Sequence, residues 1–168
     1  MLVGVNTTLA TLALPSASIE LLRAAPEHLP AIVKLLAADP LGSTREVVAA
    51  EQDLVPYERA FQAIDADPAQ LLVVATAGKE VVGTLQLSFI PGLARRGALR
   101  GQIEAVRVHE DYRNAGLGAA MFEWAIIEAR RRGCALVQLT TDKTRTDAQR
   151  FYQRLGFTAS HEGLKLAL

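Results

Sequence analysis

Apolar positions along the chain follow two different spacings, which predicts a fold built from both strands and helices. Short runs rich in Val, Leu and Ile predict strands, and apolar residues three and four positions apart predict helices. Strands are expected at 19–25, 71–76, 81–89, 99–108, 136–141, 157–159 and 164–168. Helices are expected at 26–39, 57–65, 117–132 and 147–155. Strands interleaved with helices in this order predict an α/β fold.

Prolines, glycines and one aspartate mark the ends of the predicted helices. Pro40 and Pro68 stop the first two, because proline cannot continue the hydrogen bonding of a helix. Gly133 and Gly156 are suited to end the other two. Asp147 is expected to cap the start of the last helix.

Three of the predicted strands are expected to lie in one sheet. Strands 71–76 and 81–89 flank the sequence AGKE, which predicts a β-hairpin. Strand 99–108 alternates well enough to join them and leads directly into the sequence RNAGLG at 113–118. A long apolar helix begins within that sequence, so a strand, a glycine turn and a helix follow one another.

The composition indicates one compact domain and excludes several classes of protein. The 168 residues are 50% hydrophobic, which is enough for a proper core. The 18 basic and 18 acidic residues cancel, so no overall field attracts nucleic acid or an anionic membrane. Cys134 is the single cysteine, which excludes an internal disulfide and favours a reducing cytoplasm. The three histidines show no metal-ligand spacing, so no metal is expected.

The start of the chain is expected to remain outside the main domain. No apolar run reaches the roughly 20 residues of a membrane-spanning helix, so an integral membrane protein is not expected. Residues 1–18 are apolar but lack the basic start of a secretory signal. We expect an N-terminal extension or an extra edge strand at 1–18, and one domain over 19–168.

The sequence RNAGLG at 113–118 is typical of a turn that binds a pyrophosphate. Gly116 and Gly118 let the main chain approach a ligand closely, and the N–H groups of the turn lie beside the start of a helix, where anions are stabilised. The alternative is a glycine turn without a ligand, with Arg113 as an ordinary surface arginine. The sequence further along the chain decides between them.

A second motif, AQRFYQRLGF at 148–157, follows the turn after one helix and one strand. Together the two segments resemble the GNAT acetyltransferase superfamily, whose acetyl-CoA motif is [QR]-x-x-G-x-[GA] and whose later motif is A-x-x-F-Y-x-x-L-G-F. The resemblance covers 19–168 and implies the GNAT acyl-CoA N-acyltransferase fold, a central mixed sheet flanked by helices. It also implies an acetyl-CoA-dependent N-acetyltransferase. The end of the chain is similar to bacterial members of unassigned substrate.

The resemblance assigns acetyl-CoA binding mainly to the main chain. The backbone of Val106 and Val108 is implied to pair with the pantetheine arm like an extra strand, while their side chains belong to the core. A backbone N–H near Val106 is also implied to face the thioester carbonyl. The residues assigned to the pyrophosphate turn are Arg113, Asn114, Ala115, Gly116, Leu117 and Gly118.

Two more residues are assigned to acetyl-CoA binding by the resemblance. Arg145 stands where many members of the family carry an asparagine that helps to hold the pantetheine arm, so this chain departs from the pattern there. Phe151 adjoins the catalytic tyrosine of the motif, although its ring is expected to serve mainly in packing.

Two side chains are candidates for proton transfer. By the resemblance Tyr152 is the general acid, since a phenol with a pKa of about 10 stays protonated at neutral pH and can donate to a leaving thiolate. A purely structural core aromatic is the alternative. Glu104 is the candidate general base, because strand alternation places it on one face with Arg100 and Gln102. An ordinary exposed or ion-paired glutamate is the alternative.

The acceptor of the acetyl group is not identified by the sequence. Its pocket is expected to come from 41–57, from the loop 90–97 and from the final strands, so small-molecule amines and protein amines both remain open. A catalytically silent acetyl-CoA-binding sensor or regulatory protein is the second hypothesis, because a fold does not fix a function. Nucleic-acid binding through Arg130-Arg131-Arg132 is not favoured, since arginines at a helix end serve the helix dipole and solvent. A homodimer is an expectation from the resemblance alone.

Overall fold

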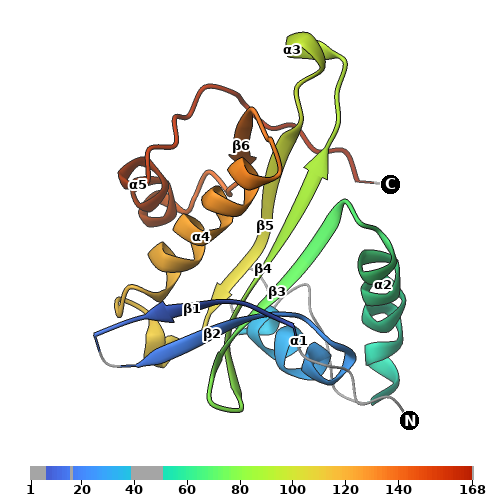
Figure 1. The fold of residues 1–168 in the computed structure, drawn as a ribbon, viewed down its shortest axis with the longest axis vertical. Coiled ribbons are helices and arrows are strands. Elements are labelled where there is room, and N and C mark those ends of the chain that lie inside the picture. Colours follow the sequence, from blue (N-terminus) through green and yellow to red (C-terminus); the bar gives the residue numbers. More distant parts are fainter. Residues whose placement is uncertain (1–6, 16, 39–50, 168) are drawn as a thin grey trace.

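The computed structural model describes residues 7–15, 17–38 and 51–167. Figure 1 shows a central sheet with helices on both of its faces. The strands are β1 (Thr8–Ala13), β2 (Ser18–Arg23), β3 (Gln70–Ala77), β4 (Glu80–Ile90), β5 (Arg100–Val108) and β6 (Leu136–Leu139). The α-helices are α1 (Leu29–Ala37), α2 (Val55–Ala66), α3 (Ala94–Gly97), α4 (Leu117–Arg131) and α5 (Thr146–Arg154). Short 3₁₀ helices are η1 (Pro26–His28), η2 (Glu51–Leu54) and η3 (Glu110–Tyr112).

The sheet is mixed, and its six strands follow the order of the chain from β1 to β6. All neighbours are antiparallel except β5 and β6, which run parallel because α4 carries the chain back between them. The predicted hairpin is confirmed as β3 and β4, joined at Gly78 with a φ of 61°. The predicted fold class, a mixed sheet flanked by helices, is confirmed.

The helix α4 packs very closely on one face of the sheet. A Cβ built at Gly83 would lie 3.0 Å from the Sδ atom of Met121, and one built at Gly101 would lie 3.3 Å from the Cβ of Ala129. Glycine at these two strand positions therefore leaves room for the helix. The core between α4 and the sheet includes Met121 and Val73, both fully buried.

The helices α1 and α2 cover part of the opposite face. Val74, the next residue along β3, packs there with Ile32 and Val33 of α1 and Phe61 of α2. Because successive strand residues point to opposite faces, Val73 and Val74 belong to two different cores. This explains why the interior of β3 reads as a continuous apolar run.

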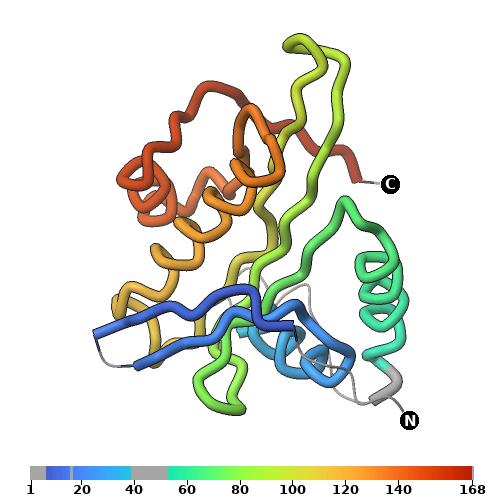
Figure 2. Tube along the Cα trace, viewed as in Figure 1, coloured from blue at the N-terminus to red at the C-terminus, as the bar shows by residue number. Residues whose placement is uncertain are grey.

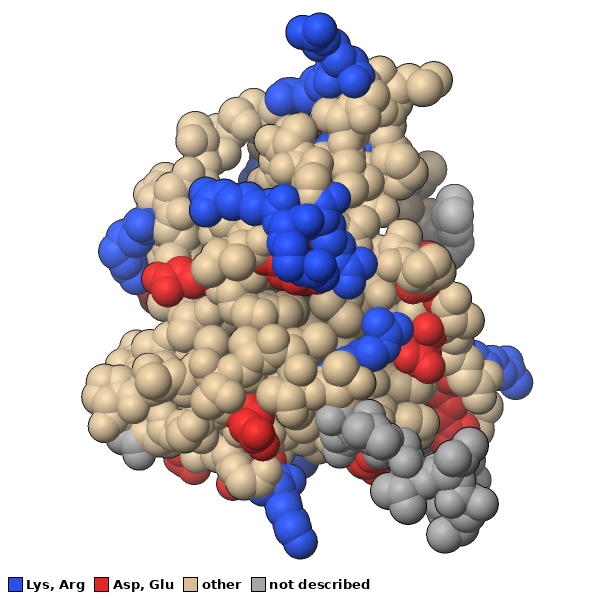
Figure 3. Space-filling view, viewed as in Figure 1, with Lys and Arg blue, Asp and Glu red and all other residues tan. Residues whose placement is uncertain are grey.

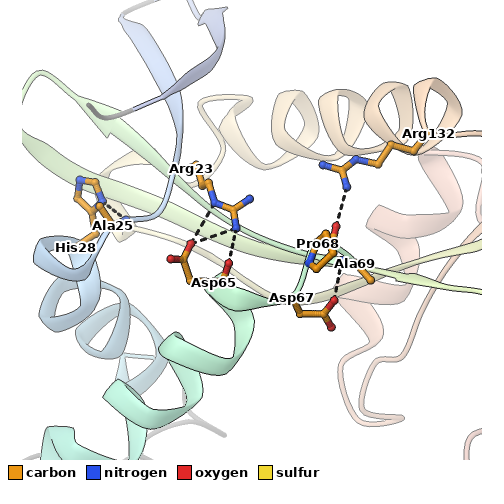
Figure 4. Close-up of polar contacts among 8 residues, drawn as sticks. All are labelled: Arg23, Ala25, His28, Asp65, Asp67, Pro68, Ala69 and Arg132. Carbon is orange, nitrogen blue, oxygen red and sulfur yellow. Dashed lines mark hydrogen bonds and ion pairs between the residues drawn. The ribbon is translucent and has the colours of Figure 1, made fainter. Parts of the chain in front are cut away.

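Polar contacts tie the end of α2 to its neighbours (Figure 4). Arg23 of β2 donates to Asp65 through an ion pair of 3.2 Å, and the backbone N–H of Ala69 donates to Asp67 Oδ1 at 2.8 Å. Arg132 reaches the carbonyl of Pro68 at 3.3 Å from the end of α4. These contacts fix the chain where it enters β3.

Several element boundaries differ from the sequence prediction. The second helix begins at Val55, two residues earlier than expected, because a proline in the first turn lacks only an N–H that has no helical acceptor. Most of the segment 41–57, which is expected to contribute to the acceptor pocket, lies outside the described residues. The edge strand β1 pairs antiparallel with β2 within the predicted N-terminal segment. No helix of the described residues is long and apolar enough to span a membrane.

The two final strands are a wrong prediction. Residues 157–167 form no strand, and Figure 2 shows them as an irregular segment leaving α5. Leu164 and Leu166 are 93% and 86% exposed. The alternation of apolar residues suggested a strand, but a strand needs a neighbour to satisfy its main chain and a core to bury its apolar face. Residue 168 lies outside the described residues.

The predicted cap at Asp147 is also wrong. Arg145 holds the N-terminal cap position of α5, and no side chain caps this helix. Asp147 lies inside the first turn, where its carboxylate pairs with Arg150 one turn later. A negative charge there still favours the helix through the dipole, which accounts for the position of the aspartate in the sequence.

Candidate active site

The strand β5 leaves part of one edge unpaired. It pairs with β6 only from Arg100 to Ile103, whereas its pairing with β4 continues to Val108. Residues 104–108 therefore have β4 on one side and, within the described chain, no strand on the other. Such an edge offers main-chain donors and acceptors to an extended ligand.

A β-bulge lies where β5 parts from β6. The register shifts between Thr84 and Gln86, so that Ala105 and Val106 together face Leu85. Ala105 has a φ of 52°, which costs about 1–3 kcal/mol for a residue with a side chain. A bulge bends and twists its strand, in agreement with the separation of β5 from β6 at this point.

The main chain of Val106 and Val108 points toward the open edge. His109 N donates to Val82 O at 2.8 Å, so alternate residues of β5 bond to β4 and the intervening ones face away from it. Val106 and Val108 are the intervening residues. Their side chains pack against the main core, as the sequence predicted.

Two arginine side chains donate hydrogen bonds to the carbonyl oxygens of this edge. Arg107 Nη1 donates to the oxygen of Val106 at 2.8 Å, and Arg113 Nε donates to the oxygen of Val108 at 3.3 Å. Arginine side chains are long and rotatable, so an incoming amide N–H can replace these bonds without rearrangement of the strand.

The glycine turn has the backbone geometry of an anion site. Asn114 and Gly116 have φ angles of 62° and 88°. Gly116 is the residue before α4, and its carbonyl accepts the first helical bond from Ala120 N at 3.0 Å. The first N–H groups of any helix lack helical acceptors, and the positive end of the helix dipole lies at the same place. The turn can therefore bind an anion through its main chain.

Neither packing nor backbone conformation requires glycine at position 118. A Cβ there would lie 3.8 Å from Phe151 Cζ and 3.9 Å from a Cγ atom of Val108, which are ordinary contact distances. Its φ lies outside the left-handed region that favours glycine. A ligand that approaches the main chain closely gives glycine a purpose at this position, which fits a pyrophosphate.

Tyr152 belongs to a cluster of four aromatic rings. The centroid of Phe122 lies 5.4 Å from that of Tyr152 and 5.6 Å from that of Phe151, and Phe157 lies 6.2 Å from Tyr152. The tilted and edge-to-face geometries are those that stabilise aromatic pairs. Since Phe122 lies on α4, the cluster holds α5 against α4 and fixes the ring of Tyr152.

The environment of Tyr152 keeps its phenol protonated. Burial raises the pKa of Tyr152 above its ordinary value, and the positive charges of Arg145 and Arg107 offset part of this rise. A phenol in this state can donate a proton at neutral pH. Arg145 thus lies close enough to act on Tyr152, and its main chain closes the turn before α5 through a bond from Arg145 N to Asp142 O of 3.0 Å.

Glu104 lies just before the bulge and is exposed. It faces Gln86 across the sheet, and the register confirms that Arg100, Gln102 and Glu104 share one face. In the described part of the chain Glu104 makes no hydrogen bond or ion pair through its side chain, so the ion-paired alternative has no support. A free carboxylate beside the open edge can accept a proton.

The other residues considered in the sequence analysis make contacts within the described part of the fold that do not form a binding or catalytic site. Arg131 and Arg132 bind Glu128 at 2.7 and 2.8 Å, and the Arg132 guanidinium lies 4.2 Å from the ring centroid of Phe89. Basic side chains form separate groups on the face drawn in Figure 3, without a continuous basic surface. Cys134 is half-buried, and burial raises the pKa of its thiol. Among residues 7–15, 17–38 and 51–167 no group of three or more acidic, histidine or cysteine side chains is arranged for a metal.

Sequence reasoning missed three features of this site. The bulge is one, because alanine at Ala105 gives no signal for a positive φ. The second is the support of Tyr152 by Phe122 and Phe157. The sequence shows only that aromatic residues occur within two helices and directly after Gly156. The third is Arg107, because nothing in the sequence shows that its side chain folds back to bond the carbonyl of the preceding residue, Val106, on the open edge.

Two parallel strands that separate, a glycine turn at the start of the helix between them and a half-buried tyrosine on the next helix define the acyl-CoA acyltransferase class. The chain belongs to the acetyltransferase (GNAT) family, whose sequence model matches residues 30–157.

Three known proteins illustrate the relationship. The aminoalkylphosphonate N-acetyltransferase of Salmonella typhimurium is 33% identical over 116 residues, covering 69% of this chain and 75% of that enzyme. The glucosamine 6-phosphate N-acetyltransferase of Trypanosoma brucei brucei is 35% identical over 88 residues, covering 52% of this chain and 58% of that enzyme. A crystal structure described as a transcriptional regulator from Bacillus halodurans C-125 is 46% identical, with a TM-score of 0.85 over 89% of this chain and 99% of that one.

Proposed function

We propose that this protein transfers the acetyl group of acetyl-CoA to a primary amine by direct attack of the amine on the thioester. The observation that carries the proposal is the open edge of β5, which begins at Glu104 and leads toward the glycine turn. The positive charge of Arg107 on this edge acts on the phenol of Tyr152. In this proposal, main-chain pairing, an anion site and two proton-transfer groups would act along this edge. Membership of the GNAT family supports the same reaction.

The donor would be held mainly by backbone groups. Within the turn 113–118, Arg113 N and Ala115 N donate to Glu110 O at 3.1 Å and to Tyr112 O at 3.4 Å, so the other N–H groups of the turn would bind the pyrophosphate. The main chain of Val106 and Val108 would pair with the pantetheine arm in place of the two arginine side chains. Gly118 would give the ligand access to the main chain, and Phe151 would lie beside it across Gly118. Arg145 would stand near the reacting end, because its charge already reaches Tyr152.

The proton transfers follow from the two candidate side chains. Glu104, directly or through water, would take a proton from the ammonium form of the acceptor, whose amine then forms the new C–N bond. A main-chain N–H near Val106 would stabilise the oxyanion of the tetrahedral intermediate. As the C–S bond breaks, Tyr152 would give its proton to the departing thiolate. No metal takes part in this scheme.

The relatives favour a small molecule as the acceptor over a protein. The enzymes from Salmonella and Trypanosoma are named for aminoalkylphosphonates and for glucosamine 6-phosphate, which are both small amines. The irregular final segment and the loop at α3 lie near the ends of β4, β5 and β6 and would border such an acceptor.

Two measurements test this function. Isothermal titration with acetyl-CoA should give saturable binding at one site per chain, and release of free CoA thiol should follow the addition of amines from a chemically varied panel. Absence of binding would refute the assignment of the donor site. Binding without thiol release by any amine would refute the catalytic role.

A regulatory protein that binds acetyl-CoA without turnover is the second candidate. The structural relative from Bacillus halodurans, described as a transcriptional regulator, is the observation that favours it. The exposed Glu104 and the protonated Tyr152 are features that catalysis needs and simple binding does not. The thiol-release assay separates the two functions.

A further inference from the structure

A row of polar side chains crosses the sheet on the face opposite α4. The strand registers pair Gln70 with Ser88, Ser88 with Gln102, and Gln102 with Gln138, so these four residues lie in one line across β3, β4, β5 and β6. We call these residues, together with the adjacent Gln86, the amide row. Glu104, which faces Gln86, lies two residues along β5 from Gln102 and on the same face.

The amide row is bonded within itself. Gln70 Oε1 accepts from Ser88 Oγ at 2.7 Å and from Gln86 Nε2 at 3.1 Å. Gln102 Oε1 accepts from Gln138 Nε2 at 2.8 Å. Ser88 and Gln102 are only 7% and 8% exposed, so these bonds fix the carboxamides in place.

The internal bonds leave the other half of each carboxamide unused. In the described part of the chain, the Nε2 groups of Gln70 and Gln102 and the Oε1 atoms of Gln86 and Gln138 make no hydrogen bond. None of these four atoms is sealed from solvent as an unsatisfied buried group. The row therefore lies half-buried near the proposed catalytic base, and its free donor and acceptor atoms, which carry no charge, keep some contact with solvent.

The position of the amide row is unusual for a structural feature. The same face of the sheet carries the apolar core of α1 and α2 around Val74, and a buried hydroxyl, that of Thr84, donates there to the carbonyl of Val73 at 2.9 Å. The amide row lies where β3 begins and β4 ends, and its members are half-buried or buried. Burying a polar group costs free energy unless the group is hydrogen-bonded, so four glutamines are a costly way to fill this part of the sheet. Recognition of a polar ligand gives them a purpose.

We propose that the amide row is the acceptor-binding surface and that it recognises a hydroxyl-rich amine of the amino-sugar type. A hydroxyl group both donates and accepts, which matches the alternating free donors and acceptors of the row. A purely alkyl amine would leave these groups desolvated and unpaired, so the row would also select against it. The proposal rests on the acetyltransferase function proposed above.

The test compares two amines of the same ring size on three variants. Glucosamine carries ring hydroxyls and cyclohexylamine does not, and thiol release gives kcat/KM for each. Gln102→Leu and Gln138→Leu remove one carboxamide each at nearly constant volume. Gln62→Leu, at an exposed position on α2, makes the same chemical change away from the row and serves as the control.

The expected result is a change in selectivity. Each of the two row variants should lower kcat/KM for glucosamine by roughly 10-fold and leave that for cyclohexylamine within about 2-fold of wild type. Because each amine is compared with itself, the ratio of kcat/KM between variant and wild type does not depend on the different basicity of the two amines. Equal losses for both amines, or no loss for glucosamine, would overturn the proposal.

A binding measurement keeps the proposal testable apart from turnover. Saturation-transfer NMR should detect glucosamine bound to the wild-type protein and to Gln62→Leu, and should give a weaker signal with Gln102→Leu at the same concentrations. Acetyl-CoA titration of each variant shows whether the fold and donor site survive. If acetyl-CoA binds but no amine is acetylated, the proposed function fails, and weaker glucosamine binding by the row variants still supports the surface. If amines are acetylated but glucosamine shows no dependence on the row, only the inference fails.

Discussion

The substitution Gly118→Ala separates binding of the donor from stability of the fold. The added methyl group would contact Phe151 Cζ at 3.8 Å and a Cγ atom of Val108 at 3.9 Å, without a clash, and the backbone lies outside the left-handed region. Gly118 is the second residue of α4, and alanine is the better helix former. The free energy of unfolding should therefore rise by about 0.4–1 kcal/mol, which is a gain of about 1–4 °C in Tm.

The same substitution should weaken the binding of acetyl-CoA. The same methyl group projects from the main chain of the turn into the space that a pyrophosphate would need, so the Kd should rise by at least about 10-fold, or about 1.4 kcal/mol. Isothermal titration gives the Kd, and thermal unfolding with and without acetyl-CoA gives both quantities on one sample. At 100 times the wild-type Kd, the ligand should stabilise the wild type by about 2.7 kcal/mol and the variant by clearly less.

The control and the refutation are both specific. Gly92→Ala adds a methyl group in the loop before α3, where the nearest atom, Ala98 O, is 3.7 Å away, and it should leave acetyl-CoA affinity unchanged. If Gly118→Ala binds acetyl-CoA as tightly as the wild type, the turn does not hold the pyrophosphate through a close approach to its main chain. If the variant is instead less stable, the packing argument for Gly118 is wrong.

Four other predictions follow from the same structure. Tyr152→Phe keeps the aromatic cluster and should lower kcat by about 10²-fold with an unchanged acetyl-CoA Kd, since general acid catalysis contributes about 10²–10⁴-fold; an unchanged kcat would exclude the phenol as the acid. Glu104→Gln should lower kcat/KM most for strongly basic amines and less as the pH rises toward the pKa of the amine, and a loss independent of pH would argue for a positioning role. Gly116→Ala should destabilise the fold by about 1 kcal/mol through its φ of 88°, as measured by urea unfolding; full stability would show that the turn can relax. Glu128→Gln should cost up to about 1 kcal/mol at pH 7, because the hydrogen bond from Arg131, with that from Arg132, lowers the pKa of Glu128 below its ordinary value. The stability that this carboxylate adds is present above the unfolded-state pKa of about 4.5 and is lost as the pH falls through the lower folded-state pKa, so the stabilities of wild type and variant should converge below that folded-state pKa.

The parts of the fold with a local cause were predictable from the sequence. The hairpin of β3 and β4, the helix α4 and its end at Gly133 follow from apolar spacing and from glycine at a positive φ, which neighbouring residues are enough to specify. The final strands failed because alternation at Leu164 and Leu166 indicates a face that could be buried, but cannot show whether any partner lies beside it.

The candidate site shows the same division. The glycine turn and the motif around Tyr152 could be found, because each is a continuous segment whose function depends on a few fixed neighbours. The bulge at Ala105 and the amide row could not, since both depend on the register between strands. Gln70 and Gln138 are 68 positions apart in the sequence, and only the pairing of four strands brings them into one line.

The open edge of β5 also bears on the solubility of the protein. An unpaired strand edge is normally a risk, because a strand from another molecule can add to it and start aggregation. Here the unpaired segment lies inside the fork between β5 and β6, it is broken by a bulge, and its carbonyls are covered by two charged side chains, Arg107 and Arg113. A thin ligand with a few amide groups can enter such a fork, whereas a protein strand flanked by its own side chains meets both the bulge and the positive charges. The features that prepare the edge for a small partner therefore also protect it from a large one.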